Sequence, residues 1–310
     1  MAKILFIGDV VGKGGRKILR EVLPQWREKY QPDAVIVNVE NLAHGKGVTP
    51  TTLGELDGLD IDCYTSGNHI FKKGELSSAS FEKYDKLIRP ANYESLLDKA
   101  KQKQSVPGYG YYRFSKLLHP PLTPPLKGGE SESADDKVPS PLGGGQGRGN
   151  SRQFLVINLN GQVFMEHQFD GAIENPFLAL DRLILDQGQK GDIIIVDFHA
   201  EATSEKIALG YHMDGKVTAV LGTHTHVPTA DARVLPNGTA HITDVGMTGA
   251  LNGVLGVKKE SALKKFLNAE EKFKYEIEED GTLQINGVLI ETSADGKAQS
   301  ITKLYQELPN

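Results

Sequence analysis

The chain has 310 residues, of which 39% are hydrophobic and 24% are charged, so it can bury a full core and is not an intrinsically disordered protein. Its formal net charge is −5 and its isoelectric point is near 6.0, which argues against a binder of duplex nucleic acid, because such proteins usually carry a basic face. Cys63 is the only cysteine, which leaves no internal disulfide or thiolate metal cluster to consider. The first ten residues hold one lysine and an apolar run too short for a signal peptide or a membrane span. We therefore expect a soluble cytoplasmic protein with no membrane contact.

The amino-terminal part alternates predicted strands and helices. Short apolar or β-branched runs predict strands at residues 3–8, 33–38 and 60–65. Between the first two strands, apolar side chains recur at helical spacing on one face: Ile18, Leu19, Val22, Trp26 and Tyr30. Pro24 lies inside this pattern and should kink or restart the helix.

The glycine-rich segment GDVVGKGGR, residues 8–16, directly follows the first predicted strand. A Walker phosphate loop needs four residues between its first glycine and its Gly-Lys pair, but only three intervene here, and the position for a hydroxyl residue holds Gly14. The dinucleotide fingerprint cannot be fitted to these glycines either. Asp9 is then the residue of interest, because open α/β sheets build their sites at the carboxyl ends of strands. Lys13 and Arg16 are candidates for attracting an anionic substrate.

A Pro/Gly-rich segment at about residues 116–151 interrupts this pattern. It separates two runs, 111–114 and 153–159, that predict the two strands of a hairpin. Because such a composition buries little apolar surface, we expect a disordered surface insertion. A proline-rich docking site for a partner is the alternative.

The second half continues with predicted strands at 192–198 and 217–222 and then changes character. From about residue 272 the segments FKYEIEE, TLQINGVLIET and QSITKLY predict antiparallel strands, joined by turns at Asp280-Gly281 and Asp295-Gly296. Together these elements predict an α/β protein with two packed mixed β-sheets flanked by helices. We expect one domain over 1–310, interrupted only by the insertion.

Four further polar clusters share the placement of Asp9 after an apolar run. They are Asn38-Val39-Glu40-Asn41, Gly67-Asn68-His69, Asp197-Phe198-His199-Ala200-Glu201 and Gly222-Thr223-His224-Thr225-His226. Their side chains can converge at one edge of a sheet. Two residues apart in an extended chain, His224 and His226 would lie on one face, which is a metal-ligand spacing. Imidazole, carboxylate and amide ligands without thiolate suit manganese, iron, cobalt or zinc.

Each cluster also has a purely structural interpretation. A strand-end Asp usually caps the following helix, an Asn-His pair usually lies in a turn, and a single buried His is usually a core residue with its hydrogen bonds satisfied. Five such clusters at five strand ends favour a functional site instead. Asp231 and residues 244–249 lie near the last histidines in sequence, and they either support the site or contact another copy of the chain.

These motifs, in this order, resemble the calcineurin-like metallophosphoesterase superfamily. The matching strings are GD (8–9), NVEN (38–41), SGNH (66–69), DFHAE (197–201) and GTHTH (222–226). The longer strings GDVVGKGGR, VNVENLAHGKG, SGNHIF, DFHAEATSEK, GTHTHVPTAD and DVGMTG resemble its YmdB-like branch, bacterial phosphodiesterases associated with 2′,3′-cyclic nucleotides. The resemblance covers nearly the whole chain except the insertion, and it implies a four-layer α/β/β/α sandwich.

The resemblance also implies a dinuclear metal centre. Glu40 would bridge two divalent ions, with Asp9 and His226 on one and Asn68, His199 and His224 on the other. The superfamily usually has Asp-x-His at the first motif, whereas this chain has Asp9-Val10-Val11, so Asn41 is the expected substitute ligand. We expect iron or manganese first, with zinc or cobalt as alternatives.

The implied reaction is hydrolysis of a small phosphodiester, 2′,3′-cyclic nucleotides above all. A hydroxide bridging the two metals would attack, and His69 would protonate the leaving oxygen as general acid. Alternatively, His69 only makes a hydrogen bond to a ligand. Two other functions stay open: a metal-containing regulatory or RNA-binding protein, and a different dinuclear hydrolase such as a monoesterase or an RNase. Association into a homo-oligomer is a further expectation.

Overall fold

The computed structural model of the chain describes residues 1–97, 102–118, 151–165, 168–267 and 276–309. The predicted bounds of the insertion, about 116–151, include residues of regular strands at both ends: residues 116–117 and residue 151. Residues 119–150, on which the prediction of disorder rests, lie outside the described residues.

The first sheet has six strands in the order β13-β14-β1-β2-β3, with β15 paired to β14. The neighbours β1, β2 and β3 are parallel, whereas β14 is antiparallel to β1 and to β15. Its strands are β1 (Lys3–Ile7), β2 (Ala34–Asn38), β3 (Cys63–Thr65), β13 (Gly249–Ala250), β14 (Leu283–Thr292) and β15 (Ala298–Leu308). The turn between β14 and β15 at Asp295-Gly296 is confirmed.

The second sheet has six strands in the order β11-β12-β10-β9-β7-β6. Its central strands β7, β9, β10 and β12 are parallel, and β6 and β11 are antiparallel at the two edges. Its strands are β6 (Tyr111–Leu117), β7 (Ser151–Asn160), β9 (Ile193–His199), β10 (Ala219–Thr223), β11 (Arg233–Val234) and β12 (Ala240–Ile242). The pairing of β6 with β7 confirms the predicted hairpin across the insertion.

The described residues also form six helices. They are α1 (Gly12–Tyr30), α2 (Pro50–Gly54), α3 (Ser78–Lys83), α4 (Pro176–Gln187), α5 (Thr203–His212) and α6 (Lys259–Leu267). Helix α1 runs through Pro24 as one helix, so the predicted restart is wrong. Its buried face, with Ile18 and Val22 before the proline and Trp26 after it, packs in the core on both sides of that residue. No helix in the described part of the chain is long and apolar enough to cross a membrane.

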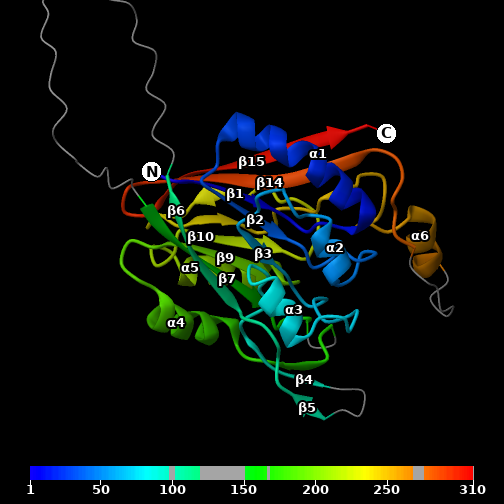
Figure 1. The fold of residues 1–310 in the computed structure, drawn as a ribbon, viewed down its shortest axis with the longest axis horizontal. Coiled ribbons are helices and arrows are strands. Elements are labelled where there is room, and N and C mark those ends of the chain that lie inside the picture. Colours follow the sequence, from blue (N-terminus) through cyan, green and yellow to red (C-terminus); the bar gives the residue numbers. More distant parts are fainter. Residues whose placement is uncertain (98–101, 119–150, 166–167, 268–275, 310) are drawn as a thin grey trace, which may run out of the picture.

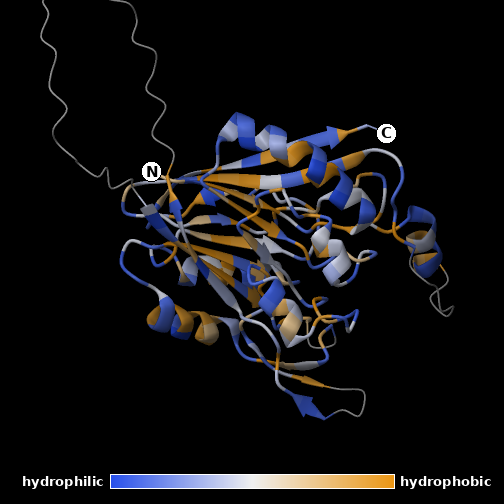
Figure 2. Cartoon of the chain, in the orientation of Figure 1, coloured by the Kyte–Doolittle hydropathy of each residue, from blue (hydrophilic) through white to orange (hydrophobic). Residues whose placement is uncertain are grey.

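Four layers follow from where the apolar side chains point. Alternate residues of β1 pack in opposite directions: Leu5 and Ile7 face α1, and Ile4 and Phe6 face the second sheet. On the far side of the second sheet, Val196 of β9 packs in the cluster that α4 and α5 complete. The two sheets lie between α1 on one side and α4 and α5 on the other (Figure 1), and hydrophobic residues concentrate in their strands (Figure 2).

Two further features of the fold differ from the prediction. A third sheet of β4 (Tyr93–Leu97), β5 (Lys103–Gln104) and β8 (Gly171–Ile173) was not expected. The predicted strand 273–279 is also wrong where it is described, since only Ile277 forms a bridge, to Val257; residues 273–275 lie outside the described residues. The first residues of β14 pair with β13 instead.

Candidate metal centre

The predicted site residues meet where strands of the two sheets end. Asp9 follows β1, Glu40 and Asn41 follow β2, and Asn68 and His69 follow β3 in the first sheet. His199 is the last residue of β9, and His224 and His226 follow β10 in the second sheet. All five strands belong to parallel ladders, so their carboxyl ends meet at one edge of the paired sheets.

The centre of the cluster is a group of acceptor atoms that face one another. The Nε2 atom of His199 lies 3.1 Å from Glu40 Oε2, 3.0 Å from Asn68 Oδ1 and 3.0 Å from His224 Nδ1. Ligand atoms of Glu40, His199 and His224 all lie within 4.8 Å of one another, a spacing that fits one metal ion.

Each of the three imidazoles is held from outside by its other ring nitrogen. The Thr223 hydroxyl donates its proton to Asp197 Oδ1 at 2.7 Å. Thr223 Oγ1 must therefore accept from Nδ1 of His199, which lies 2.9 Å away. Nε2 of His224 donates to Glu201 at 2.9 Å, and Nδ1 of His226 donates to the Leu255 carbonyl at 3.1 Å. With these protons placed outside, the inner nitrogens of all three rings carry lone pairs, as metal ligands require.

Asp9 is a buried carboxylate whose charge is not balanced. Its Oδ2 accepts a hydrogen bond from the His224 backbone N–H at 3.2 Å, but its Oδ1 has no hydrogen-bond partner in the described structure. Burial, together with the like charge of Glu40, raises the pKa of Asp9 well above its usual range. Both effects would be relieved by a cation beside Oδ1.

Burial also favours the neutral form of two of the imidazoles, His199 and His226. It lowers the pKa of His199 to about 4 and moves the pKa of His226 downward. Burial acts to raise the pKa of Glu40 as well, but His199 and His69 outweigh it and the net shift is downward. At neutral pH an ionised Glu40 therefore lies beside the uncharged rings of His199 and His226.

Asn41 and His69 form a pair beside Glu40. The Asn41 amide nitrogen donates to Glu40 Oε1 at 3.0 Å and lies 3.2 Å from His226 Nε2, while its oxygen lies 3.0 Å from His69 Nδ1. Coordination by the Asn41 oxygen would require the amide to turn round. No hydrogen bond to Nε2 of His69 is present in the described structure, and this ring lines the cavity of the site.

Local backbone geometry brings these side chains together. A Cβ on Gly67 would lie 2.2 Å from Glu40 Oε2 and 2.3 Å from His199 Cδ2, so only glycine permits this approach. The expectation that His224 and His226 lie on an extended chain is wrong. Strand β10 ends at Thr223, and the φ angles of His224 and His226 are 94° and 64°, a left-handed conformation that is costly outside glycine and common at functional sites.

Several supporting residues had no definite role in the prediction, although residues 244–249 were expected either to support the site or to contact another copy of the chain. Glu201 was inside a quoted cluster but had no assigned role. Lys206 and Asp244 form a buried ion pair of 2.9 Å, and Asp244 Oδ2 also accepts from the Thr225 N–H at 3.0 Å and its hydroxyl at 2.6 Å. Asp244 thereby fixes the loop between the two histidines. Burial raises the pKa of Asp197 to about 7.

The amino end of α1 is engaged by protein groups, in agreement with the rejection of a phosphate loop. The Gly12 N–H donates to the Asn41 carbonyl at 3.0 Å, and the Val11 N–H donates to the Thr248 carbonyl at 2.8 Å. The prediction that Arg16 attracts a substrate is wrong. Its side chain is buried and donates hydrogen bonds to Glu55 and to the Leu42 carbonyl.

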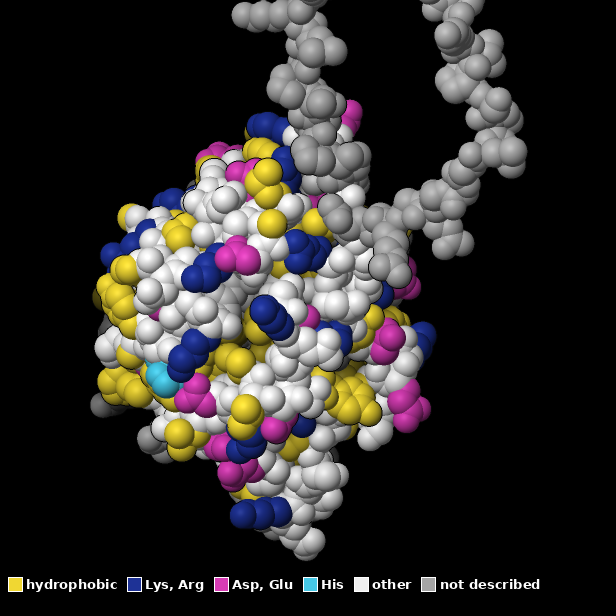
Figure 3. Space-filling view, turned by 90° about the vertical axis from the view of Figure 1, so that its left-hand side faces the viewer, with side chains coloured by type: hydrophobic (Ala, Val, Ile, Leu, Met, Phe, Trp, Pro, Cys, Tyr) yellow, Lys and Arg dark blue, Asp and Glu magenta, His cyan; other side chains and the backbone are white. Residues whose placement is uncertain are grey.

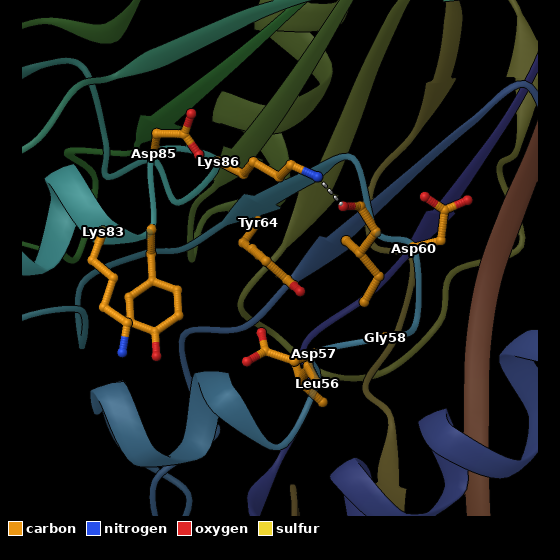
Figure 4. Close-up of a pocket in the computed structure, with 10 residues that line it drawn as sticks. Leu56, Asp57, Gly58, Asp60, Tyr64, Lys83, Asp85 and Lys86 are labelled. Atoms are coloured by element: carbon orange, nitrogen blue, oxygen red, sulfur yellow. Dashed lines mark hydrogen bonds between the residues drawn. The ribbon is translucent and has the colours of Figure 1, made fainter.

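The cluster opens into a cavity of about 280 Å³ that Glu40, His69, His224 and His226 help to line. A larger pocket of about 510 Å³ lies elsewhere, beside β3 (Figure 4). There Tyr64 points inward between Asp57 and Lys86, and Lys86 donates to the Ile61 carbonyl at 3.3 Å. None of the described residues lining this second pocket is a histidine. Pocket size alone therefore does not identify the site.

The residues present fit a metal centre. Hydrogen-bond acceptors face one another around His199, and Asp9 Oδ1 has no hydrogen-bond partner among the described residues. A cation would stabilise this group of acceptors. Its oxygen and imidazole donors, without sulfur, suit manganese, iron, zinc or cobalt.

Known proteins similar to this chain match it over almost its whole length. The family profile described as YmdB-like protein matches residues 5–116 and 143–304. A 2′,3′-cyclic-nucleotide 2′-phosphodiesterase of Bacillus subtilis is 36% identical over 309 residues, which cover 99% of this chain and 97% of the relative.

Two solved structures share the fold. One, a novel phosphatase of Mycoplasma pneumoniae, has a TM-score of 0.78 and 32% identity, over 100% of this chain and 94% of its own. The other, a hypothetical protein of Thermus thermophilus, has a TM-score of 0.75 and 32% identity, over 99% of this chain and 100% of its own. These likenesses confirm the predicted α/β/β/α fold.

Proposed function

The chain belongs to the YmdB-like protein family, and from that premise we propose that it is a metal-dependent phosphodiesterase acting on 2′,3′-cyclic nucleotides. The observation that carries the proposal is the inward-facing set of acceptors around His199, at the strand ends where the family motifs lie. The B. subtilis relative, named for that activity, supports the choice of substrate.

We assign the metal ligands to two groups that share Glu40. Glu40 would join Asn68, His199 and His224 in one group, and it would join Asp9, His226 and a turned Asn41 in the other. Two divalent ions held there, iron or manganese first, would polarise the phosphoryl oxygens and lower the pKa of an attacking water. The outward hydrogen bonds of the imidazoles keep the ligand nitrogens aimed inward.

His69 is proposed as the general acid. Its Nδ1 lies 3.4 Å from Glu40 Oε1, which anchors the ring and leaves Nε2 to deliver a proton at the cavity. The ring is partly exposed, as a group that exchanges protons with solvent must be. A proton given to the leaving oxygen would avoid release of an alkoxide.

The distribution of charge favours a small substrate over duplex nucleic acid. On the face in Figure 3, basic and acidic side chains of the described residues are interspersed. Lys46 is a cationic residue that lines the cavity, where it could attract a single phosphate. A phosphomonoesterase is the second candidate, because the M. pneumoniae relative carries the name phosphatase.

Turnover of three substrates tests the proposal. Purified protein with added manganese should hydrolyse 2′,3′-cyclic AMP and a nitrophenyl phosphodiester faster than a nitrophenyl monoester. A preference for the monoester would favour the phosphatase. Failure on all three with metal bound would favour a regulatory or RNA-binding role.

A further inference from the structure

The cavity of the site is lined by two chemically different groups of side chains. Polar side chains of the site, among them Glu40, His69 and His226, form one group. The other group, which we call the apolar wall, consists of Val11, Leu255, Val257 and Ile277. The four residues of this wall carry neither charge nor hydrogen-bonding side chains, so they would not bind the phosphate itself.

The wall is built by a tight turn and the segment beside it. The N–H of Val254 donates to the Val257 carbonyl at 2.7 Å, and the N–H of Val257 donates back at 3.0 Å. The turn is fixed to the next segment by bonds from Lys258 N to Glu276 O at 2.8 Å and from Glu278 N to Gly256 O at 2.9 Å. These bonds place Val257 and Ile277 side by side.

Ile277 packs against Gly45 and Gly12, where a larger residue would collide with it. A Cβ on Gly45 would lie 2.3 Å from Ile277 Cδ1, and one on Gly12 would lie 3.3 Å from Ile277 Cγ2. Gly45 has a φ of 73°, which also favours glycine at that position. The apolar wall therefore depends on a close approach to the loop after β2.

Leu255, at the tip of the turn, connects the wall to the proposed ligands. Its carbonyl accepts the hydrogen bond from Nδ1 of His226, whose Nε2 faces the centre. The Leu255 side chain is 50% exposed although it lines the cavity. An exposed apolar side chain held at a fixed place beside the phosphate position is suited to contact an organic group of the same substrate.

We propose that Leu255, Val257 and Ile277 form a subsite for the nucleobase of the substrate. This inference rests on the proposed function, because it assumes a nucleotide whose phosphate lies at the ligands. A flat base gains most from apolar contact over its face, and these side chains offer no hydrogen bonds that read base edges. The subsite should accept all bases and favour purines, which have the larger face.

The experiment compares 2′,3′-cyclic AMP with ribose 2,3-cyclic phosphate, which is the same diester without a base. Leu255→Ser and Ile277→Ser should each lower the ratio of kcat/KM for the nucleotide to that for the ribose compound by about tenfold, the usual effect of a lost apolar contact. Leu185→Ser is the matched control: this leucine on α4 is 83% exposed, and the ratio should not change. Ratios within twofold of wild type in both folded site variants would overturn the subsite.

Binding gives a readout that does not depend on turnover. Calorimetric titration of the metal-loaded protein with adenosine 3′-monophosphate should show about tenfold weaker affinity for Leu255→Ser and Ile277→Ser than for wild type. If wild type hydrolyses neither diester, the proposed function fails, and this titration alone decides the subsite. Equal affinities for wild type and both variants would then refute it.

Discussion

The ammonium of Lys206 lies 2.9 Å from the carboxylate of Asp244, and both side chains are almost fully buried behind the histidine loop. The same Asp244 oxygen accepts two hydrogen bonds from Thr225, which lies between His224 and His226. Lys206 also donates to the Thr225 hydroxyl at 3.3 Å. A buried ion pair thus sets the position of two proposed metal ligands without touching the centre itself.

Lys206→Met should destabilise the protein and weaken metal binding. Removing one partner leaves Asp244 as an uncompensated buried charge, which costs about 3–5 kcal/mol of unfolding free energy. Loosening of the loop should lower metal affinity by about 10–100-fold. Denaturant unfolding and metal titration measure the two effects.

Lys216→Met is the control for this change. Lys216 pairs with Asp181 at 3.4 Å, but its side chain is 49% exposed, so its loss should cost less than about 1 kcal/mol. Equal effects of the two substitutions would show that the buried pair has no special role.

His69→Ala should keep its metal and lose turnover on 2′,3′-cyclic AMP by about 10²–10⁴-fold. The loss should be much smaller on a nitrophenyl diester, because that leaving group needs little protonation. His212→Ala, which removes an imidazole on α5 paired with Asp181, should leave both rates near wild type. An equal loss on both substrates would assign His69 a structural role instead.

Gly67→Ala should abolish metal binding. The new methyl group would meet Glu40 and His199 at distances no real contact allows, and both side chains would have to move. Gly54→Ala is a suitable control, because a Cβ there would have its nearest neighbours at 3.8 Å. Metal analysis of the two purified variants checks this, and normal metal content in Gly67→Ala would show that Glu40 and His199 need not sit so close.

Glu55→Gln should reduce stability at neutral pH but not in acid. The hydrogen bond from Arg16, opposed by partial burial, holds the pKa of Glu55 below its ordinary value of about 4.5. A lowered carboxyl pKa stabilises the folded state at pH values above the unfolded pKa, and this contribution is lost as pH falls through the folded value. Because Glu55 is partly exposed, we expect only about 0.2–1 kcal/mol at pH 7.

Unfolding curves at pH 7 and pH 3 test this, and the wild type and Glu55→Gln should differ only at the higher pH. Glu21→Gln is the control, and it should not change the stability at either pH. Glu21 is exposed on α1 and has no ion pair in the described structure. A difference that persists at pH 3 would contradict the role of the charge.

Much of the site could be predicted because polar residues such as Asp9 and Glu40 directly follow buried strands. In parallel sheets the strand ends meet at one edge, so local sequence is enough to place these residues together. The extended chain predicted for His224 and His226 was wrong because Asp244, distant in sequence, fixes a turn there.

Other features depend on contacts that have no local pattern. The pairing of Lys206 with Asp244 joins α5 to a loop 38 residues away. The first residues of β14 pair with β13 and not with the segment just before them, which the alternation of FKYEIEE could not reveal. In helix α1, the packing of an apolar face outweighs the local effect of Pro24.

The metal content of purified wild type and Glu40→Gln tests the central claim most directly. The amide removes the charge of the proposed bridging ligand but keeps its shape. We predict about two divalent ions per wild-type chain, and a marked loss of both metal and hydrolysis in Glu40→Gln. A Glu40→Gln protein that keeps its full metal content and its activity would contradict the dinuclear centre proposed here.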